Sequence, residues 1–398
     1  MIHPLPSGWQ EAKLRDILFI SSKKYDPQKN KTNYKCIELE HIESDTGILK
    51  GYINSNDQLS IKNIFENGDI LYGKLRPYLR KFHNAKFNGV CSSEIWVLKG
   101  KKVINEFLYY FIQSYKFDHI ANISCGTKMP RADWSYMSEI NFIIPPLEEQ
   151  KHIAEVLSLC DDIIENLTEL IEKKEQYKKG VMQRLLSGEV RFKGFTDEWK
   201  TVRLGDLATI TSAGVDKKIN TDEKKVRLLN YLDVFNRNKL YDNEISFITS
   251  ANDTQIEKCN IKKGDLFITP SSEDREGIAK SAVAMEDFDN VVYSYHIIRL
   301  RFNKEIDLKF KSYMCDTELF HRQAYRLCDG SGQRYVISLG TFREMKIYIP
   351  TSIEEQRKIG EFLSTIDNEI DNLKKQLELR KQQKKGLMQK LLTGEVRI

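Results

Sequence analysis

One stretch of the sequence concentrates basic and aromatic side chains without a single acid: YGKLRPYLRKFHNAK, from Tyr72 to Lys86. Basic side chains neutralise phosphates, and the arginine fork can also contact guanine O6 and N7 in the major groove. The stretch therefore predicts contact with DNA, and Pro77 is expected to hold it as an extended loop. The alternative is a solvated basic loop over a strand. The residues predicted to make the contact are Lys74, Arg76, Tyr78, Arg80 and Lys81.

Three further segments are candidates for the same role. FITPSSEDREGIAKS occupies the corresponding place in the second half of the chain, with a charge balance near zero. CGTKMPRADW and DGSGQRYVIS contain glycines, which let a backbone approach a ligand closely, although a plain turn is the alternative for both. Different side chains at corresponding positions are expected of two readers of two different DNA sequences. The predicted contact residues are Ser271, Ser272, Arg275 and Lys280 in the first segment, Lys128 and Arg131 in the second, and Arg334 in the third.

The sequence shows no pattern typical of a catalytic or metal centre. It has no GxxxxGK[ST] phosphate loop, no GxGxxG after a strand, no Asn-Pro-Pro-aromatic methyltransferase motif, no GxSxG and no HExxH. The seven cysteines form no CxxC pair, so we expect reduced and mostly buried thiols, with disulfides or a zinc site as the alternative. We therefore predict no catalytic residue and no metal ligand in this chain.

A long internal repeat dominates the organisation of the chain. Each residue from Leu147 to Phe192 pairs with the residue 206 positions later, and 24 of these 46 pairs are identical without a gap. The likeness is strongest in the tails, KKGVMQRLLSGEVRF and KKGLMQKLLTGEVRI. Fainter likeness precedes each copy, as in NGDILYG and KGDLFIT, or SSEIWVL and SYHIIRL. The chain is therefore predicted to be two copies of one module.

The segment before each repeat is predicted to be a mixed α/β domain. GDILYGKL and GDLFIT predict Gly-Asp turns that open short strands, and IWVLKG and HIIRLRF are rich in strand formers. NEFLYYFIQSYKFDHI and DLKFKSYMCDTELFHRQAY have helical spacing of large apolar residues, with buried strand as the alternative. The predicted segments are recognition domains at 1–146 and 193–352, and long helices at 147–192 and 353–398.

The repeated segments are predicted to be helices that form a coiled-coil seam. In the first copy the a row is Ile153, Cys160, Leu167, Lys174 and Val181, and the d row is Val156, Ile163, Leu170 and Tyr177. An adjacent e row holds Leu157, Ile164, Ile171 and Leu185. A rod of forty residues is roughly 60 Å long, too long to be covered by one small domain. The expected partner of each helix is the other copy, in antiparallel orientation; the alternative is packing on its own domain.

Charged runs interrupt the apolar stripe at the same place in both copies. They read EKKEQYKK and RKQQKK. Such a run indicates either a solvated face or a docking surface for another subunit. The apolar ends LLSGEVRF and LLTGEVRI need cover under both interpretations.

The order of these features resembles the specificity subunit of type I restriction-modification systems. The likeness rests on the opening P-x-G-W, the GDIL strand, the GTKMP loop and the IPPLEEQ motif before a long helix, and it covers essentially the whole chain. It implies two α/β recognition domains that each read half of a bipartite, asymmetric DNA site. It also implies two antiparallel helices that set the spacer, and an internal pseudo-twofold symmetry.

The same resemblance implies partners and cofactors. Two methyltransferase subunits would dock on the chain and bind S-adenosylmethionine, and restriction subunits would add ATP- and Mg-dependent translocation and cleavage. The chain itself would be noncatalytic and hold no cofactor. No signal peptide or membrane-spanning run is visible, so a cytoplasmic location is expected. The rival functions are a coiled-coil scaffold without DNA specificity and the specificity part of a fused restriction-modification enzyme.

Overall fold

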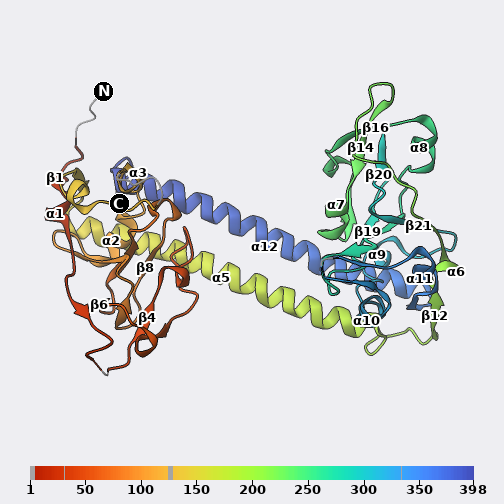
Figure 1. The fold of residues 1–398 in the computed structure, drawn as a ribbon, viewed down its shortest axis with the longest axis horizontal. Helices are drawn as coiled ribbons and strands as arrows, with labels where there is room; N and C mark the ends of the chain where they lie inside the picture. Colours follow the sequence, from red (N-terminus) through yellow and green to blue (C-terminus); the bar gives the residue numbers. More distant parts are fainter. Residues whose placement is uncertain (1–4, 31, 124–128, 333) are drawn as a thin grey trace. The chain divides into compact units, whose positions relative to one another are not determined.

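The structure is a computed structural model that describes residues 5–30, 32–123, 129–332 and 334–398 (Figure 1). The chain divides into two compact units: unit 1 is Met1–Glu169 with Lys375–Ile398, and unit 2 is Leu170–Lys374. Each unit therefore contains one variable segment, the beginning of the long helix that follows it, and the end of the other long helix. The four-segment division stays a prediction, because these units cut across both helices.

Unit 1 is built on a four-stranded and a five-stranded sheet. The four-stranded sheet has the order β2-β10-β7-β8 and is antiparallel, whereas the five-stranded sheet β3-β6-β9-β4-β5 contains one parallel pair, β4 with β9. A separate pair, β1-β11, joins the start of the unit to the strand before the long helix. The strands are β1 Gln10–Lys13, β2 Leu18–Ile20, β3 Lys24–Tyr25, β4 Lys35–Ile37, β5 Ile53–Asn54, β6 Lys62–Phe65, β7 Ile70–Gly73, β8 Phe82–Asn84, β9 Gly89–Cys91, β10 Ile95–Gly100 and β11 Asn141–Ile144. The short helices are α1 Leu14–Ile17, α2 Asn105–Phe111, α3 Tyr115–Ile123 and α4 Trp134–Met137, with 3-10 turns η1 Leu39–His41, η2 Ser55–Asp57 and η3 Pro77–Leu79.

Unit 2 repeats this plan with different lengths and an additional small sheet. Its sheets have the orders β13-β21-β17-β19-β15, β16-β14-β20, β12-β24 and β18-β23-β22. The strands are β12 Trp199–Arg203, β13 Ala208–Thr211, β14 Lys224–Leu229, β15 Lys239–Leu240, β16 Ile248–Ala251, β17 Leu266–Ile268, β18 Ser271–Ser272, β19 Ser281–Ala284, β20 Val291–Tyr293, β21 Ile298–Phe302, β22 Asp329–Ser331, β23 Arg334–Val336 and β24 Lys346–Pro350. The short helices are α6 Leu204–Leu207, α7 Tyr231–Phe235, α8 Asp253–Lys258, α9 Leu308–Lys311, α10 Glu318–Leu327 and α11 Leu339–Glu344, with a 3-10 turn η4 Asp242–Glu244.

The predicted Gly-Asp turns are confirmed in both units. Gly68 and Gly264 have φ of +86° and +85°, a conformation that a glycine adopts without a Cβ penalty. The next residue stabilises each turn with its carboxylate: Asp69 Oδ2 accepts the N–H of Glu66 at 2.8 Å, and Asp265 Oδ2 accepts the N–H of Lys262 at 2.8 Å. The strands β7 and β17 follow, as the sequence predicts. The predicted helical segments are also helical, but each is divided in two, into α2 and α3 and into α9 and α10.

The two repeats form the long helices α5, Leu147–Leu186, and α12, Ile353–Thr393 (Figure 1). Each helix ends before the end of its repeat, because Gly188 and Gly394 follow with φ of +74° and +72°. The chain then turns back, and the N–H of Val190 bonds the carbonyl of Arg184 as that of Val396 bonds Lys390. The predicted helical residues after Leu186 and Thr393 are therefore turn and irregular structure.

The helices are antiparallel within each unit, as predicted, but their seam uses the a and e rows and not the d row. In α5 the buried residues follow the spacing Ile153, Leu157 and Ile171, and in α12 they include Ile359, Leu363, Ile366 and Ile370. The d-row residues Ile163, Leu170 and Tyr177 are 46%, 42% and 54% exposed. The second copy already distinguished these rows, because the positions equivalent to these three residues are Glu369, Gln376 and Gln383.

Residues of the charged run in each helix form ion pairs with the opposite helix. Neither the solvated-face nor the docking-surface interpretation of the runs includes such pairs. In unit 2, Lys174 and Glu175 of the first run pair with Glu369 and Lys374 of α12, both at 2.6 Å. In unit 1 the Asp161 carboxylate accepts a hydrogen bond from Tyr110 Oη at 2.9 Å and forms an ion pair with Lys384. Asp367 in unit 2 contacts Tyr313 and Lys178 in the same way. Each aspartate thus joins its own helix, the other helix and its α/β domain.

A buried glutamate at the start of each long helix makes the most extensive of these repeated contacts. In unit 2 Glu355 is fully buried, and Arg191 donates two hydrogen bonds to its carboxylate, both at 2.7 Å. Trp199 Nε1 donates to the same carboxylate at 3.2 Å. In unit 1 the Glu149 carboxylate accepts two hydrogen bonds from the Arg397 guanidinium, at 3.1 and 2.9 Å, and one from Trp9 Nε1 at 3.0 Å. The tail of one repeat is therefore attached to the start of the other, beside the first strand of the α/β domain.

The leucines near the end of each repeat, next to these contacts, are buried, as the sequence predicts. Leu185 and Leu186 lie in the core of unit 2 with Ile359 and Leu363. Leu391 and Leu392 lie in the core of unit 1 with Ile153 and Leu157. The helix ends are thus part of the domain cores, and the antiparallel pairing is needed to complete both cores.

We predict that Glu355→Ala lowers the free energy of unfolding of the full chain by about 3 kcal/mol. The substitution leaves the Arg191 guanidinium and the Trp199 N–H without their acceptor, and breaking a buried pair on one side costs about 3–5 kcal/mol. Denaturant unfolding followed by circular dichroism measures the loss. Glu361→Ala is the matched control, since Glu361 is exposed on the same helix and its substitution is expected to change stability by less than about 0.5 kcal/mol. Equal stability of the two variants would contradict the role assigned to Glu355.

Candidate nucleic-acid interface

The basic stretch of unit 1 crosses from β7 to β8 at one end of the four-stranded sheet. Its middle is the 3-10 turn η3, which Pro77 begins, so the prediction of an extended loop is wrong. Arg76 and Arg80 flank the turn with φ of +51° and +48°, an uncommon conformation for residues with a Cβ. Proline with φ near −65° suits the first position of such a turn, which is why it starts one here.

The predicted contact residues in this stretch divide into exposed and structural side chains. Arg76 and Tyr78 are exposed, Tyr78 by 56%, and Lys74 is half-buried. Arg80 instead pairs with Asp45 at 2.5 Å and with Asp118 at 2.7 Å, and its Nη2 donates to the Gln113 carbonyl at 3.2 Å. The structural group also includes Lys81, whose Nζ donates to the Leu39 carbonyl at 2.6 Å. Arg76 and Tyr78 are thus the members of this set whose side chains are exposed to solvent.

The second predicted segment of unit 1 lies directly beside the first. Leu75 and Arg131 form an antiparallel bridge, and the N–H of Arg76 donates to the Pro130 carbonyl at 2.7 Å. Arg131 donates from Nε and Nη2 to Glu94 at 2.9 and 3.2 Å, which fixes its guanidinium plane. Lys128, the other predicted residue, lies outside the residues that the structure describes. The structure thus brings two segments, about fifty residues apart in sequence, to one place.

Unit 2 joins its two candidate segments in the same manner but with regular strands. β18 contains Ser271 and Ser272, and it pairs with β23, where Ser272 faces Tyr335 and Ser271 faces Val336. The predicted loop DGSGQRYVIS is therefore the β22-β23 hairpin, and Arg334 begins its second strand as an exposed residue.

The remaining predicted residues of unit 2 are less exposed to solvent than Arg334. The Arg275 guanidinium lies over two rings, 5.0 Å from the centre of Tyr335 and 5.6 Å from that of Tyr325, and the side chain is half-buried. Lys280 is also half-buried, and Ser272 is 9% exposed. Arg334 is therefore the most exposed of the predicted residues in this unit.

Sequence reasoning missed the corner between β20 and β21, which adjoins Arg334. It contains Tyr295, 50% exposed, whose ring centre is 3.9 Å from that of His296. Burial lowers the pKa of His296, and the nearby charges of Lys217 and Arg334 lower it further. The signal in the sequence was the faint repeat of SSEIWVL as SYHIIRL, which contained an exposed aromatic residue and a histidine that received no role.

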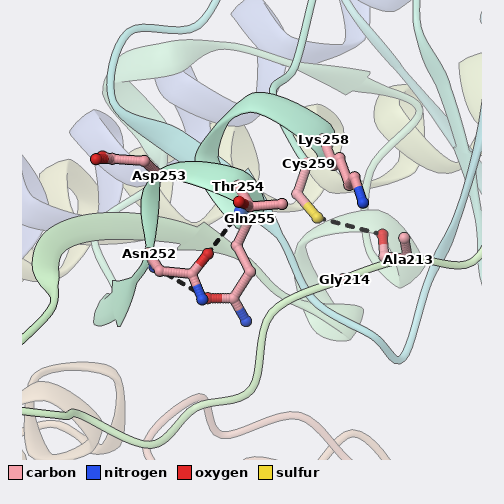
Figure 2. Close-up of a pocket in the computed structure, with 8 residues that line it drawn as sticks. All are labelled: Ala213, Gly214, Asn252, Asp253, Thr254, Gln255, Lys258 and Cys259. Atoms are coloured by element: carbon pink, nitrogen blue, oxygen red, sulfur yellow. Dashed lines mark hydrogen bonds between the residues drawn. The ribbon is translucent and has the colours of Figure 1, made fainter.

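A hollow of unit 2 lies beside this corner, between α8 and the segment after β13, where Gly214 lies against the backbone of Tyr295. It has a volume of about 510 Å³ and is lined by Ala213, Gly214, Asn252, Asp253, Thr254, Gln255, Lys258 and Cys259 (Figure 2). Asn252 and Gln255 bond each other through a capping box, and Cys259 Sγ donates to the Ala213 carbonyl at 3.5 Å. These polar groups satisfy one another and offer no arrangement of nucleophile and base.

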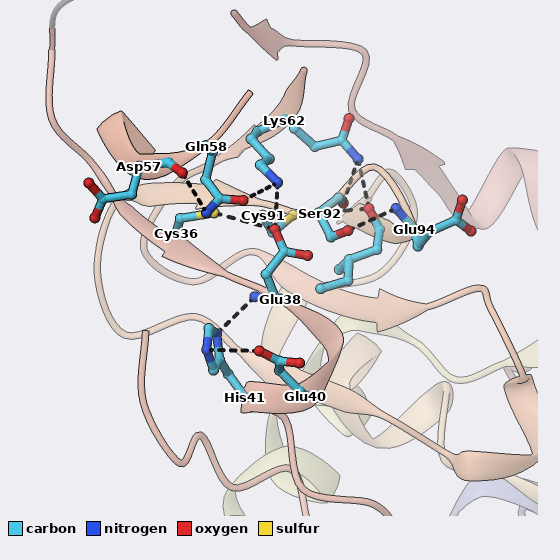
Figure 3. Close-up of polar contacts among 12 residues, drawn as sticks. Cys36, Glu38, Glu40, His41, Asp57, Gln58, Lys62, Cys91, Ser92 and Glu94 are labelled. Carbon is cyan, nitrogen blue, oxygen red and sulfur yellow. Dashed lines mark hydrogen bonds and ion pairs between the residues drawn. The ribbon is translucent and has the colours of Figure 1, made fainter. Parts of the chain in front are cut away.

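A buried ionic cluster in the five-stranded sheet of unit 1 also has a structural role. Lys62 is 3% exposed and donates to Glu38 at 2.5 Å and to Gln58 at 3.0 Å (Figure 3). Burial raises the pKa of the neighbouring Cys36 thiol to about 12, and burial also raises that of Cys91. Thiols with raised pKa values are poor nucleophiles. The six cysteines described are free, and all but Cys160 are buried, as predicted; Cys125 lies outside the described residues.

Within the described part of the chain, no group of three or more His, Cys, Asp or Glu residues is placed to hold a metal ion. In that same part, no helix is both long and apolar enough to cross a membrane.

Comparison with known proteins identifies the family. The model of the type I restriction modification DNA specificity domain matches residues 6–176 and 196–381. The chain belongs to this family. The two matches cover the two modules that the internal repeat predicts, so the resemblance read from the sequence is confirmed.

Members of the specificity family resemble the chain over its full length. The type I restriction enzyme MjaVIII specificity subunit of Methanocaldococcus jannaschii is 27% identical over 99% of this chain and 94% of its own length. The putative MjaX specificity subunit of the same organism is 24% identical over 100% of this chain and 96% of its own. A putative specificity subunit of Mycoplasma pneumoniae is 23% identical over 90% and 96%.

Solved structures of the family share the fold. A chain from a study of complex assembly in a type I restriction-modification system superposes with a TM-score of 0.65, at 18% identity and 99% coverage of this chain. The specificity subunit from M. genitalium gives 0.56 at 18% identity, covering 96% of each chain. The HsdS subunit from Thermoanaerobacter tengcongensis gives 0.51 at 20% identity, covering 99% of each. The predicted fold, α/β domains with two long helices, is therefore confirmed for this specificity-family chain.

We predict that Arg80→Ala destabilises unit 1, whereas Arg76→Ala does not. The Arg80 change leaves Asp45 and Asp118 without their partner, and hydrogen bonds to charged groups contribute about 1.5–3 kcal/mol. A loss of about 2 kcal/mol in unfolding free energy is expected, measured by denaturant unfolding. Arg76 is exposed, so its removal is expected to leave stability unchanged within about 0.5 kcal/mol. The same stability for both variants would show that Arg80 is not held as described.

Proposed function

We propose that this chain is the DNA-specificity subunit of a type I restriction-modification complex. One observation carries the proposal: in each unit, two segments distant in sequence come together at the same end of the central sheet. They present Arg76 and Tyr78 in unit 1 and Arg334 in unit 2, on equivalent frameworks but with different side chains. Two readers of different composition suit a bipartite site whose halves differ in sequence.

The phosphates supply affinity and the base edges supply specificity in such an interface. Exposed lysines and arginines with interleaved tyrosines suit the first task, and an arginine fork suits the second. The long helices α5 and α12 would set the number of unread base pairs between the two half-sites. The exposed apolar d row of α5 supports its use as a docking surface for a methyltransferase subunit, because exposed apolar patches mark interaction sites.

The chain would act without chemistry of its own. We propose that two methyltransferase subunits and the restriction subunits supply the catalytic groups, with S-adenosylmethionine, ATP and Mg on those partners. The complex would work in the cytoplasm, on double-stranded DNA. The rival, a coiled-coil scaffold with incidental basic loops, gives no reason for the paired segments at the sheet ends.

A salt titration of DNA binding distinguishes these functions. We expect the logarithm of the association constant of the full chain, purified with its methyltransferase subunits, to fall linearly with the logarithm of salt concentration, by about 0.9 for each phosphate neutralised. Arg76→Ala is expected to reduce that slope by about 1, since an arginine that contacts a phosphate contributes about one unit. Fluorescence anisotropy with a labelled duplex gives both slopes.

The control is Lys304→Ala, which removes an exposed cation at the far end of β21 and is expected to keep the wild-type slope. A wild-type slope near zero would favour the scaffold. Mapping methylated adenines in a host that expresses the complex then identifies the site.

A further inference from the structure

The turn before β10 in unit 1 and the turn before β21 in unit 2 are the same structural corner. In unit 1 the N–H of Ile95 donates to the Ser92 carbonyl at 3.0 Å, and in unit 2 the N–H of Ile297 donates to that of Ser294 at 3.2 Å. The serine hydroxyls accept from Glu94 N–H at 3.5 Å and from His296 N–H at 3.3 Å. Glu94 and His296 therefore occupy equivalent positions in the two units.

The sheets place both corners against the candidate segments. Trp96 pairs with Tyr72 on β7, and Ile298 pairs with Ile268 on β17. Just beyond β7, the N–H of Lys74 donates to the Glu94 carbonyl at 3.0 Å. Just beyond β17, Pro270 accepts the N–H of Ile337 at 2.8 Å, which attaches the end of β23 to the same place. The corner thus adjoins the Arg131 segment in unit 1 and the Arg334 hairpin in unit 2.

The corner residue differs between the two units, and so does the arginine beside it. In unit 1 Glu94 takes two hydrogen bonds from Arg131 and neutralises it. In unit 2 the equivalent His296 offers no carboxylate, and within the described residues Arg334 has no ion pair. The counterpart of Arg131 in the strand pairing is Val336, which faces Ser271, and Arg334 lies two residues before it on β23. Unit 2 therefore lacks both members of the Glu94–Arg131 pair and presents Arg334 instead.

The groups around His296 add positive charge and an aromatic surface. Val215 bridges to Ser294 in parallel, which places the next residues, Asp216 and Lys217, beside the corner. The Lys217 ammonium lies 5.7 Å from the centre of the Phe247 ring. Asp216 is the acid on this side, and one of its carboxylate oxygens accepts the N–H of Lys217 at 2.6 Å. Tyr295 stands exposed beside the histidine ring.

We propose that Arg334, with Tyr295 and Lys217, is the base-reading corner of the second recognition domain, and that His296 is the position that leaves Arg334 available for it. The proposal rests on the proposed function and names the residues that would carry it out. A free guanidinium matches the two acceptors of guanine in the major groove, and a lysine beside it suits the adjoining phosphate. Arg131, fixed by Glu94, presents a different donor pattern in the first domain.

The test exchanges the corner residues of the two units. His296→Glu introduces into unit 2 the carboxylate that unit 1 already has, and it is expected to pair with Arg334. Affinity for the selected site should fall about tenfold, the loss of one good base contact. Arg334→Ala should give the same loss, and the double variant no more than either, since both changes remove one contact. His296→Gln, which carries no charge, should bind within about twofold of wild type.

The binding partner in this test is a duplex selected from a random library by the wild-type chain with its methyltransferase subunits. Each variant is measured on that duplex and on duplexes altered in one half-site at a time. The expected result is that Arg334→Ala and His296→Glu abolish discrimination at a single half-site and keep it at the other. Lys304→Ala is the control for removal of an exposed cation, since Lys304 lies just after β21 and away from the corner that precedes it. Thermal unfolding checks that each variant is folded.

The outcomes separate the two proposals. If the wild-type complex selects no sequence, the proposed function fails. If it selects a sequence and His296→Glu and Arg334→Ala bind like Lys304→Ala, the corner is not the reader and the proposed function stands. Loss of discrimination at both half-sites, or additive losses in the double variant, would also overturn the pairing described.

Discussion

The contact on which the rest of this structure depends is the buried glutamate at the start of each long helix. The carboxylates of Glu149 and Glu355 each accept hydrogen bonds from an arginine in the tail of the other repeat and from a tryptophan N–H at the start of an α/β domain. Removing a carboxylate from water is costly unless its oxygens are well bonded. Three elements must therefore meet before either charge can be buried, so the helices and domains are coupled in folding.

This constraint accounts for the uneven likeness of the two halves. The tail GEVR is repeated because its arginine must reach a glutamate in the other copy, and the leucines before it complete a domain core that also contains the start of the other long helix. Asp161 and Asp367 add a second set of contacts, in which each accepts a hydrogen bond from a tyrosine of the domain and forms an ion pair with a lysine of the opposite helix. The segments between these ties have no such requirement, and their lengths and sheets differ.

Much of the fold could be predicted from the sequence, whereas the site could be predicted only in part. Duplication and heptad spacing determine helices and turns through local rules, and Gly68 and Gly264 lie where those rules place them. The sequence of α5 has three apolar rows, a, d and e, and it does not show which two of them form the seam with α12, because an isolated helix exposes all three. Arg80 looked like a phosphate contact by type, yet its partner Asp118 lies in a separate helix, and such long-range pairing is invisible to composition. His296 was missed because its meaning depends on Glu94 at the equivalent corner.

The comparison of corners shows how one framework can support two specificities. The serine turn, the strand pairing and the Gly-Asp turn keep their backbone hydrogen bonds in both units, so residues 94 and 296 lie on the same backbone framework. In unit 1 the glutamate pairs with Arg131, whereas in unit 2 the histidine has no carboxylate and the exposed arginine is Arg334, two residues before the counterpart of Arg131. Because the backbone framework is shared, exchanges of a few exposed side chains alter the donors offered to a base edge without disturbing the buried contacts beneath. The DNA sequence read can therefore differ between the two domains, while the buried contacts of the glutamates and aspartates on the long helices stay the same.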